Sequence, residues 1–176
     1  MFSDPERNIE QFNLGKGMYI ADFGAGSGFY SFAAAEAVGE SGRVYSIDVQ
    51  KDLLQKLKNE ARNIRHLMNL EIVWADLEHL GGTRLRESSI DAVIASNVFF
   101  QLEQKDNSCM EIRRILKNGG RVLVIDWSGS IGGRGPESNK LFSREDAVKL
   151  FSKHGFIVDK DIIVGPQHYG VIFRKQ

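Results

Sequence analysis

An apolar segment that runs into three glycines at alternate positions constrains the fold of this chain more than any other feature. The segment covers residues 18–23, and the glycines after it are Gly24, Gly26 and Gly28. Glycine adopts backbone angles that other residues avoid, and it leaves no Cβ between the main chain and a ligand. The pattern therefore predicts a strand, a tight turn that lies against a ligand, and a helix that begins after Gly28.

A carboxylate further along the chain supports a nucleoside site at this turn. The β-rich run 43–48 ends in Asp48. This acid follows Gly28 by about 20 residues, the spacing at which α/β nucleotide-binding units hold ribose hydroxyls. The alternative is that Asp48 caps a helix beginning near Lys51. We expect the ribose role because of the spacing.

The spacing of the glycines distinguishes between cofactors. A dinucleotide fingerprint requires a third glycine at the position where this chain has Phe29. Asp22 would also repel a pyrophosphate, whereas it would attract a cationic ligand. A nicotinamide-dependent oxidoreductase is therefore disfavoured. S-adenosylmethionine, which carries a sulfonium and an ammonium but no phosphate, fits better.

At this point the chain resembles the class I S-adenosylmethionine-dependent methyltransferases. Residues 22–28 match their first motif, which is an acid, an apolar residue and G-x-G-x-G. Residues 116–120 are similar to the family's Leu-Lys-Pro-Gly-Gly, with Asn118 in place of proline, and His154-Gly155-Phe156 is similar to its Ala-Gly-Phe. Ser96-Asn97-Val98 resembles the Ser-Asn-Val of ubiquinone and menaquinone C-methyltransferases. The resemblance implies S-adenosyl-L-methionine as cofactor and S-adenosyl-L-homocysteine as product.

The resemblance also implies which residues bind the cofactor. They are Asp22, Gly24, Ala25, Gly26, Ser27, Gly28, Asp48, Val49, Asp76, Leu77, Ser96 and Asn97. Asp76 would hold the adenine amino group and the next backbone N–H the ring nitrogen, while the main chain at Asn97 would hold the methionine end. The alternatives are that Asp76 is an ordinary loop acid and that Asn97 only ends a strand.

Strands and helices alternate along the chain, which predicts a parallel sheet with helices on both faces. We expect strands at 18–23, 43–48, 70–75, 90–95, 121–126, 156–164 and 169–174, and helices at 29–38, 53–64, 104–117 and 144–154. Residues 165–168 are too few for a parallel crossover, so the last two strands are antiparallel. The resemblance implies an α/β, Rossmann-like, seven-stranded sheet in the order 3-2-1-4-5-7-6 with an antiparallel last strand.

Length and composition agree with one intracellular domain. The 176 residues form a single predicted methyltransferase domain, 1–176, with 23 basic and 23 acidic side chains. This balance gives no strong electrostatic signal for nucleic acid. The lone Cys109 predicts no disulfide framework and no metal site. We expect a cytoplasmic protein, because the first residues are too polar for a signal peptide and no apolar run spans a membrane.

The sequence constrains the acceptor side less. His168 and Tyr169 follow the sixth strand on the cofactor side and are the candidate catalytic residues, although a plain surface turn is the alternative. Phe99 and Phe100 either line an acceptor pocket or pack in the core, and Cys109 is expected in the core.

Two segments are candidate covers of the acceptor site. They are residues 1–14, in which Pro5, Ile9 and Phe12 would form a short helix, and the glycine-rich loop 128–139, which carries Arg134. For residues 1–14 the alternative is an acceptor site that stays open to a large partner, and for 128–139 it is a disordered connection.

We expect a small-molecule acceptor, and two rival functions remain open. One is methylation of RNA or protein, which a basic surface facing the acceptor would favour. The other is a non-catalytic accessory protein that binds S-adenosylmethionine, which lack of turnover would reveal. The acceptor, the methylated atom and the oligomeric state are not encoded in any motif that we recognise.

Overall fold

A computed structural model describes residues 4–129, 136–137 and 140–176 and shows one mixed sheet in the order β3-β2-β1-β4-β5-β7-β6. The strands are β1 (Tyr19–Phe23), β2 (Arg43–Asp48), β3 (Leu70–Trp74), β4 (Ile90–Ser96), β5 (Leu116–Trp127), β6 (Phe156–Ile162) and β7 (His168–Lys175). Strands β1 to β5 pair in parallel, and β7 runs antiparallel to both β5 and β6. The predicted order and the antiparallel last strand are confirmed.

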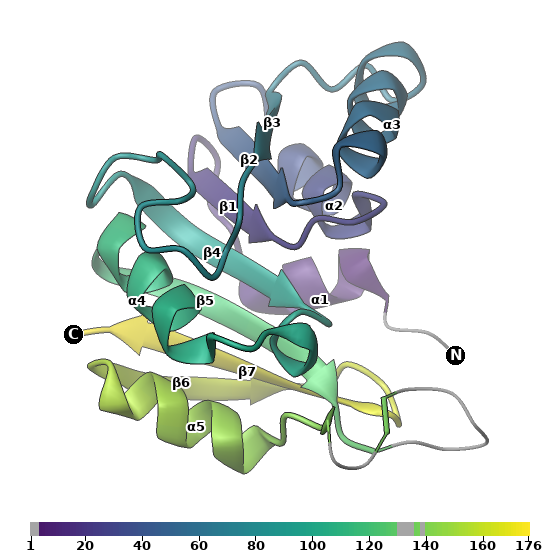
Figure 1. Ribbon diagram of the computed structural model, residues 1–176. Coiled ribbons are helices and arrows are strands. Elements are labelled where there is room, and N and C mark those ends of the chain that lie inside the picture. Colours follow the sequence, from purple (N-terminus) through teal and green to yellow (C-terminus); the bar gives the residue numbers. More distant parts are fainter. Residues whose placement is uncertain (1–3, 130–135, 138–139) are drawn as a thin grey trace.

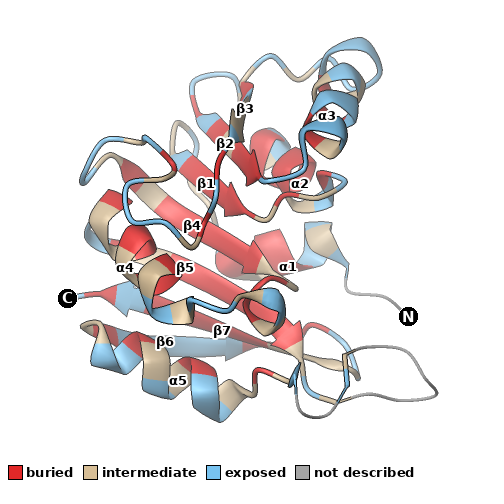
Figure 2. Ribbon diagram, viewed as in Figure 1, coloured by how far each residue is buried: buried red, intermediate tan, exposed pale blue. Residues whose placement is uncertain are grey.

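Helices cover both faces of this sheet (Figure 1). They are α1 (Pro5–Phe12), α2 (Phe29–Val38), α3 (Lys51–Asn63), the short 3-10 helix η1 (Phe99–Gln101), α4 (Lys105–Ile115) and α5 (Arg144–Lys153). One apolar core lies between the sheet and α1, α2 and α3, and the other lies between the sheet and α4 and α5. The buried residues accordingly run along the central strands and the inner sides of the helices (Figure 2).

The central strand β4 is buried on both faces, as its continuous apolar sequence predicts. The chain leaves β1 toward one edge of the sheet and continues through β4 toward the other edge. In such sheets, ligands bind beyond the carboxyl ends of the strands at this reversal of order. The glycine turn after β1 and Asn97 after β4 lie at that position.

Three details of the predicted helices are wrong. Helical spacing predicts Phe29 on one face of α2 together with Phe32 and Ala33, but Phe29, the first residue of the helix, is 64% exposed while the other two are buried. Helical spacing also predicts Ile64 on one face with Leu57 and Ala61, but Ile64 is 73% exposed, because α3 ends at Asn63. The helix predicted at 104–117 ends at Ile115, since Leu116 pairs with Ile90 and starts β5.

A helix that ended at Lys117 would use the following glycines as a left-handed cap. Gly119 and Gly120 lie instead in the irregular beginning of β5. Gly119 does adopt a positive φ, +73°, and the register of β5 against β4 shifts between Ile90 and Ala92.

Phe99, a candidate for lining the acceptor pocket, and Cys109, which was expected in the core, are both buried. Phe99 is buried, with its ring stacked 5.2 Å from that of Phe142, and Cys109 is fully buried. Burial raises the pKa of the Cys109 thiol, so the reactive thiolate is disfavoured. Both residues have the packing role.

The two candidate covers differ in what the structure describes. Residues 130–135, which include Arg134, and residues 138–139 lie outside the described residues, so the cover proposed for 128–139 is not located. Helix α1 is formed as expected, with Ile9 and Phe12 buried against α2 and the sheet.

None of the helices within the described ranges has the length and apolarity needed to cross a bilayer. The same part of the chain contains no cluster of three or more His, Cys, Asp or Glu suited to a metal ion.

Candidate cofactor and acceptor site

The glycine turn after β1 is held against β2 by its own backbone. The N–H groups of Gly24 and Ala25 both donate to the Ile47 carbonyl, at 2.9 Å each. All three glycines adopt positive φ, between +51° and +87°. This left-handed conformation strongly favours glycine.

The three glycines have different neighbours. A Cβ on Gly24 would overlap the side chain of Val98, and one on Gly28 would lie 2.6 Å from Leu57 Cγ. A Cβ on Gly26 would have no neighbour nearer than the Gly24 carbonyl oxygen at 3.9 Å. Gly24 and Gly28 thus permit close packing within the protein, whereas Gly26 borders open space.

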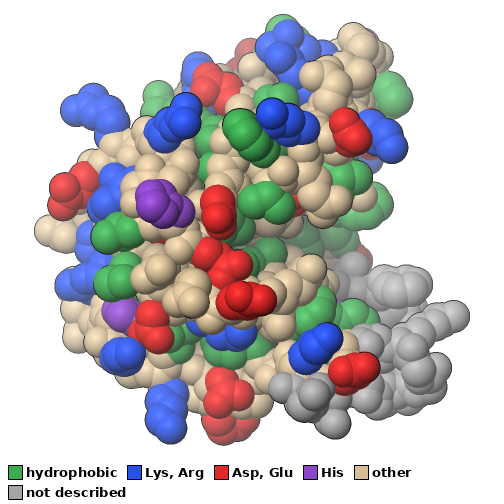
Figure 3. All heavy atoms as spheres, in the orientation of Figure 1, with side chains coloured by type: hydrophobic (Ala, Val, Ile, Leu, Met, Phe, Trp, Pro, Cys, Tyr) green, Lys and Arg blue, Asp and Glu red, His purple; other side chains and the backbone are tan. Residues whose placement is uncertain are grey.

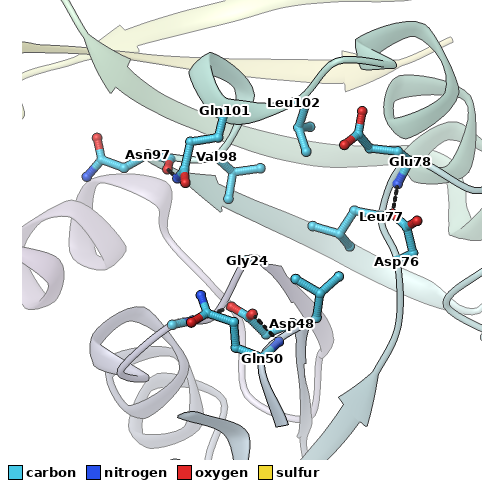
Figure 4. Close-up of a pocket in the computed structure, with 12 residues that line it drawn as sticks. Gly24, Asp48, Gln50, Asp76, Leu77, Glu78, Asn97, Val98, Gln101 and Leu102 are labelled. Atoms are coloured by element: carbon cyan, nitrogen blue, oxygen red, sulfur yellow. Dashed lines mark hydrogen bonds between the residues drawn. The ribbon is translucent and has the colours of Figure 1, made fainter. Parts of the chain in front are cut away.

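Asp48 connects the glycine turn to the start of α3. Its Oδ2 accepts a hydrogen bond from Gly26 N, and its Oδ1 accepts one from Gln50 N, each 2.9 Å long. Figure 4 shows Asp48 between the glycine turn and Gln50. The side chain is 6% exposed. It does not cap α3, because the N-cap of that helix is Gln50 and no described side chain bonds to the free N–H groups of its first turn, and it lines the space beside the glycine turn.

A first cavity, of about 380 Å³, lies beside this carboxylate. Its lining consists of Gly24, Gly26, Asp48, Val49, Gln50, Asp76, Leu77, Glu78, Asn97, Val98, Gln101 and Leu102. In Figure 4, Asp48 and Gln50 lie on one side, and Leu77, Val98 and Leu102 lie across from them. We call it the adenosine cavity, because the residues expected to hold the ribose and the adenine, Asp48, Asp76 and Leu77, all line it.

Asp76 lies at the outer edge of the adenosine cavity. Its Oδ1 accepts a hydrogen bond of 2.9 Å from Glu78 N, and the carboxylate is exposed. The neighbouring Leu77 is buried and lines the cavity. This pair lies where the adenine contacts were expected, across the cavity from Asp48 (Figure 4).

A second cavity, of about 570 Å³, adjoins the first. Its lining consists of Pro5, Asp22, Gly24, Ala25, Gly26, Phe29, Tyr30, Ser96, Asn97, Trp127 and His168. Gly24, Gly26 and Asn97 line both cavities, so a ligand that follows the glycine turn would extend from one to the other. We call the second space the acceptor cavity.

Asp22 is a buried acid at the acceptor cavity, with 2% of its surface exposed. Its Oδ2 accepts a hydrogen bond of 2.6 Å from Ser31 Oγ, which in turn accepts one of 2.7 Å from Ser46 Oγ. Burial raises the pKa of Asp22 to about 7; the bond from Ser31 opposes this shift, and the negative charge of Asp48 adds to it. A cation placed here would favour the ionised carboxylate.

Four buried polar atoms have no hydrogen-bond partner within the described part of the chain: Ser96 Oγ, Asn97 Oδ1, His168 Nε2 and Tyr169 Oη. Buried polar groups are normally paired, so a cluster of unpaired ones indicates a ligand site. Ser96, Asn97 and His168 all line the acceptor cavity. Asn97 also has a positive φ of +56°, a conformation that is uncommon outside glycine and recurs at binding sites.

The structure brings most of the expected residues to these two cavities. The exceptions are Ser27, which is exposed, Gly28, which lies under Leu57, and Tyr169, which packs in the core beside α4 and α5. His168 and Tyr169 point to opposite faces because neighbouring strand residues alternate. Of the two candidate catalytic residues, only His168 lines the acceptor cavity.

Sequence reasoning missed part of the lining. Gln50, Glu78, Gln101 and Leu102 were not proposed for the adenosine cavity, and Phe29, Tyr30 and Trp127 were not proposed for the acceptor cavity. A usable signal existed, since Phe29 and Tyr30 directly follow the glycine turn and Trp127 ends β5.

Asp126 is a second buried acid that sequence reasoning passed over. Its oxygens accept hydrogen bonds from Phe100 N at 3.1 Å and from Trp127 N at 2.9 Å. Burial raises its pKa to about 7, against the effect of these bonds. Asp126 thus fixes the end of β5 next to Trp127.

Charge around the cavities is acidic or neutral. Neither cavity has a Lys or Arg in its lining, as far as the described residues go. In the space-filling view, acidic side chains gather near the middle of the face, and basic ones are scattered around it (Figure 3).

Comparison with known proteins agrees with this geometry. Residues 14–156 match a methyltransferase domain family. The ubiquinone/menaquinone biosynthesis C-methyltransferase UbiE of Haemophilus ducreyi is 31% identical over 116 residues, which are 66% of this chain and 44% of that protein. The chain thus spans less than half the length of this curated relative.

Solved structures show the same fold. A SAM-dependent methyltransferase from Aquifex aeolicus superimposes with a TM-score of 0.88 at 26% identity, covering 98% of this chain and 90% of that one. An arsenic(III) S-adenosylmethionine methyltransferase from Chlamydomonas reinhardtii superimposes with a TM-score of 0.70 at 24% identity, covering 90% of this chain and 63% of that one, and shares the fold. From the domain match, the sheet order and the glycine turn, the chain belongs to the class I S-adenosylmethionine-dependent methyltransferases.

Proposed function

We propose that this chain binds S-adenosylmethionine across both cavities and transfers its methyl group to a small molecule. In this proposal, Asp48 holds the ribose, Asp76 and Leu77 hold the adenine, and Asp22 lies beside the ammonium of the methionine end. The observation that carries the proposal is the contact between Asp48 and Gly26 N, next to the open space at Gly26.

The residues present fit this cofactor in charge as well as in shape. S-adenosylmethionine carries a sulfonium, an ammonium and one carboxylate, so its net charge is positive, and it has hydroxyls but no phosphate. The two cavities offer the acids Asp22, Asp48, Asp76 and Glu78 and no described basic side chain. The unpaired Ser96 Oγ and Asn97 Oδ1 would receive partners from the methionine end.

The cofactor, when bound, supplies an electrophilic methyl group on a sulfonium. The role of the protein is then to position the acceptor and exclude water, since an acceptor that is already nucleophilic needs little more. The walls formed by Phe29, Trp127 and Pro5 would exclude water from the acceptor cavity. Asn97, held by the bond from its own N–H to the Ile125 carbonyl, would fix the shared border of the two cavities.

A small-molecule acceptor is supported by the size and charge of the acceptor cavity. An RNA acceptor would call for basic side chains around the opening, and the described lining offers none. The similar UbiE proteins are named for ubiquinone and menaquinone biosynthesis, which supports a small acceptor.

We further propose that α1 is a fixed wall of the acceptor cavity. Pro5 lines the cavity, and the Gln11 side chain exchanges two hydrogen bonds with the backbone of Ile163, at 2.9 and 3.0 Å. Asn8 Nδ2 donates to Tyr30 Oη at 2.8 Å.

We also propose the cytoplasm as the location of this chain, because its one cysteine, Cys109, has no second cysteine to pair with in the chain and is buried.

Calorimetric titration with S-adenosylhomocysteine, S-adenosylmethionine and NAD tests the cofactor. The proposal requires binding of the first two; tight binding of NAD without a response to S-adenosylhomocysteine would refute it. Turnover of bound S-adenosylmethionine against a panel of small molecules, an RNA and a protein then separates an enzyme from an accessory protein. Methylation of the RNA or protein alone would refute the small-molecule part.

A further inference from the structure

The acceptor cavity has two chemically different ends. Asp22 lies at the end next to the glycine turn, where the proposed function places the ammonium of the cofactor. Trp127 and His168 line the same cavity and come from β5 and from the beginning of β7, which are neighbours in the sheet. Residues of β5 and β7 have no part in the proposed cofactor contacts, so this end is available to a second molecule.

His168 is held in place by Trp127 but lacks a polar partner. The two ring centroids lie 4.3 Å apart with 36° between the ring planes. The His168 Nε2 is buried and has no hydrogen-bond partner among the described residues. Burial lowers the pKa of His168, which favours the neutral form of the ring.

The group that best satisfies this nitrogen is a hydroxyl. In a neutral imidazole, one nitrogen donates and the other accepts, and the tautomer decides which role Nε2 takes. A hydroxyl both donates and accepts, so it pairs with Nε2 in either tautomer. A carbonyl or an ether oxygen pairs with only one.

The other residues that line the acceptor cavity favour an acceptor molecule that is uncharged and mainly apolar. Phe29 and Trp127 provide aromatic walls, and Pro5 adds an apolar one. The described lining has no Lys or Arg to pair with an anionic acceptor, and burying an unpaired carboxylate or phosphate is costly. A cationic acceptor would compete with the proposed ammonium for Asp22.

We infer that the Trp127 and His168 end of the acceptor cavity binds an uncharged, largely apolar molecule that presents a hydroxyl to His168 Nε2. The inference rests on the proposed function, since it assumes that the cofactor fills the Asp22 end. His168 is then a binding residue for the acceptor. Its Nε2 is the unprotonated, accepting nitrogen of the neutral ring, so a hydroxyl donates to it, an ether cannot, and Nε2 is placed to take up the proton of that hydroxyl.

The test uses the full chain saturated with S-adenosylhomocysteine and three probes, namely 2-naphthol, 2-methoxynaphthalene and 2-naphthoate. The three probes share the naphthalene ring system, but only 2-naphthol carries a hydroxyl donor and only 2-naphthoate carries a negative charge. The naphthol should bind about tenfold more tightly than its ether, the effect of one hydrogen bond to a buried group, and more tightly than the naphthoate. Equal binding of naphthol and ether, tightest binding of naphthoate, or no binding of the naphthol would each overturn the inference.

The variant His168→Phe retains a ring but removes both nitrogens. It should bind naphthol and ether equally, while its affinity for S-adenosylhomocysteine stays within about twofold of wild type, as expected for a residue with no part in that contact. The matched control is His79→Phe, because His79 is exposed and lines neither cavity, and it should keep the preference for naphthol. A His168→Phe variant that retains the preference refutes the role of His168.

The two proposals fail in different ways. A chain that does not bind S-adenosylhomocysteine refutes the proposed function itself. A chain that binds S-adenosylhomocysteine but shows no preference for naphthol refutes only the inference about His168. A thermal melt of each variant identifies loss of folding, and ring-nitrogen NMR of His168 on adding naphthol reports the contact independently of turnover.

Discussion

The different neighbours of the glycines in the turn give a sharp test of which one serves the ligand. Replacing Gly26 by alanine adds a Cβ whose nearest protein atom is 3.9 Å away. The same replacement at Gly28 puts a Cβ 2.6 Å from Leu57 Cγ and 3.0 Å from Phe32 Cζ. Gly26→Ala should therefore impair binding, and Gly28→Ala should impair folding.

The magnitudes follow from these distances. Gly26→Ala costs only the left-handed backbone penalty, about 1–2 kcal/mol of unfolding free energy. Gly28→Ala adds an overpacking cost of about 1–3 kcal/mol to the same penalty. Overlap of this Cβ with the bound ligand would cost a similar 1–3 kcal/mol of binding free energy, which lowers affinity by roughly 5- to 150-fold. Alanine is preferred to valine because a β-branched residue at this φ would add its own strain.

The assay pairs calorimetric titration with S-adenosylhomocysteine and urea denaturation of the free proteins. Gly26→Ala should lose affinity while remaining the more stable of the two variants. Normal binding by a folded Gly26→Ala variant would show that this glycine serves the turn alone. The open space would then not be the path of the cofactor.

Three further predictions concern single side chains. Asp48→Ala should weaken S-adenosylhomocysteine binding by about 1–3 kcal/mol in calorimetry, because charge-assisted hydrogen bonds are lost; unchanged affinity removes Asp48 from the ribose role. Phe12→Ala should lower the free energy of unfolding by about 3–5 kcal/mol in urea, and a loss below about 1 kcal/mol would mean that α1 is a loosely attached cover. The free energy of unfolding of the ligand-free protein should fall as pH rises from about 4 to about 7, because Asp22 and Asp126 keep their protons in the folded chain and release them in the unfolded chain. Each of the two residues contributes up to about 1.4 kcal/mol per pH unit to this fall. Asp22→Asn should remove about half of that slope.

The sequence predicted the parts of the fold that local pattern determines. The alternation of strands and helices and the short connection at 165–168 predicted a mainly parallel sheet with an antiparallel last pair, whereas the strand order came from the resemblance to the class I methyltransferases. Leu116 was misassigned because a helical spacing of apolar residues continues through it, and its pairing with Ile90 depends on a contact distant in sequence.

The acceptor cavity could not be assembled from the sequence in the same way. Its wall combines Pro5 of α1, Phe29 at the start of α2, Trp127 of β5 and His168 of β7, which are far apart in the chain. The unpaired state of His168 Nε2 depends on what packs around it, so it is visible only in three dimensions.

The two acids at the glycine turn also provide a test of which class of ligand binds there. Asp48 is satisfied by two backbone N–H groups, whereas Asp22 is paired with Ser31 alone and has a pKa of about 7. A ligand with an ammonium favours the ionised form of Asp22, so its binding releases a proton and its affinity rises with pH up to about 7. A phosphate ligand favours the neutral form and would show the opposite slope. Titration with S-adenosylhomocysteine between pH 5.5 and 7.5 should show an affinity that rises with pH. The Asp22→Asn variant should show little change of affinity with pH. An affinity that falls with pH in the wild-type chain would place a negative ligand group beside Asp22 and contradict the proposed orientation of the cofactor.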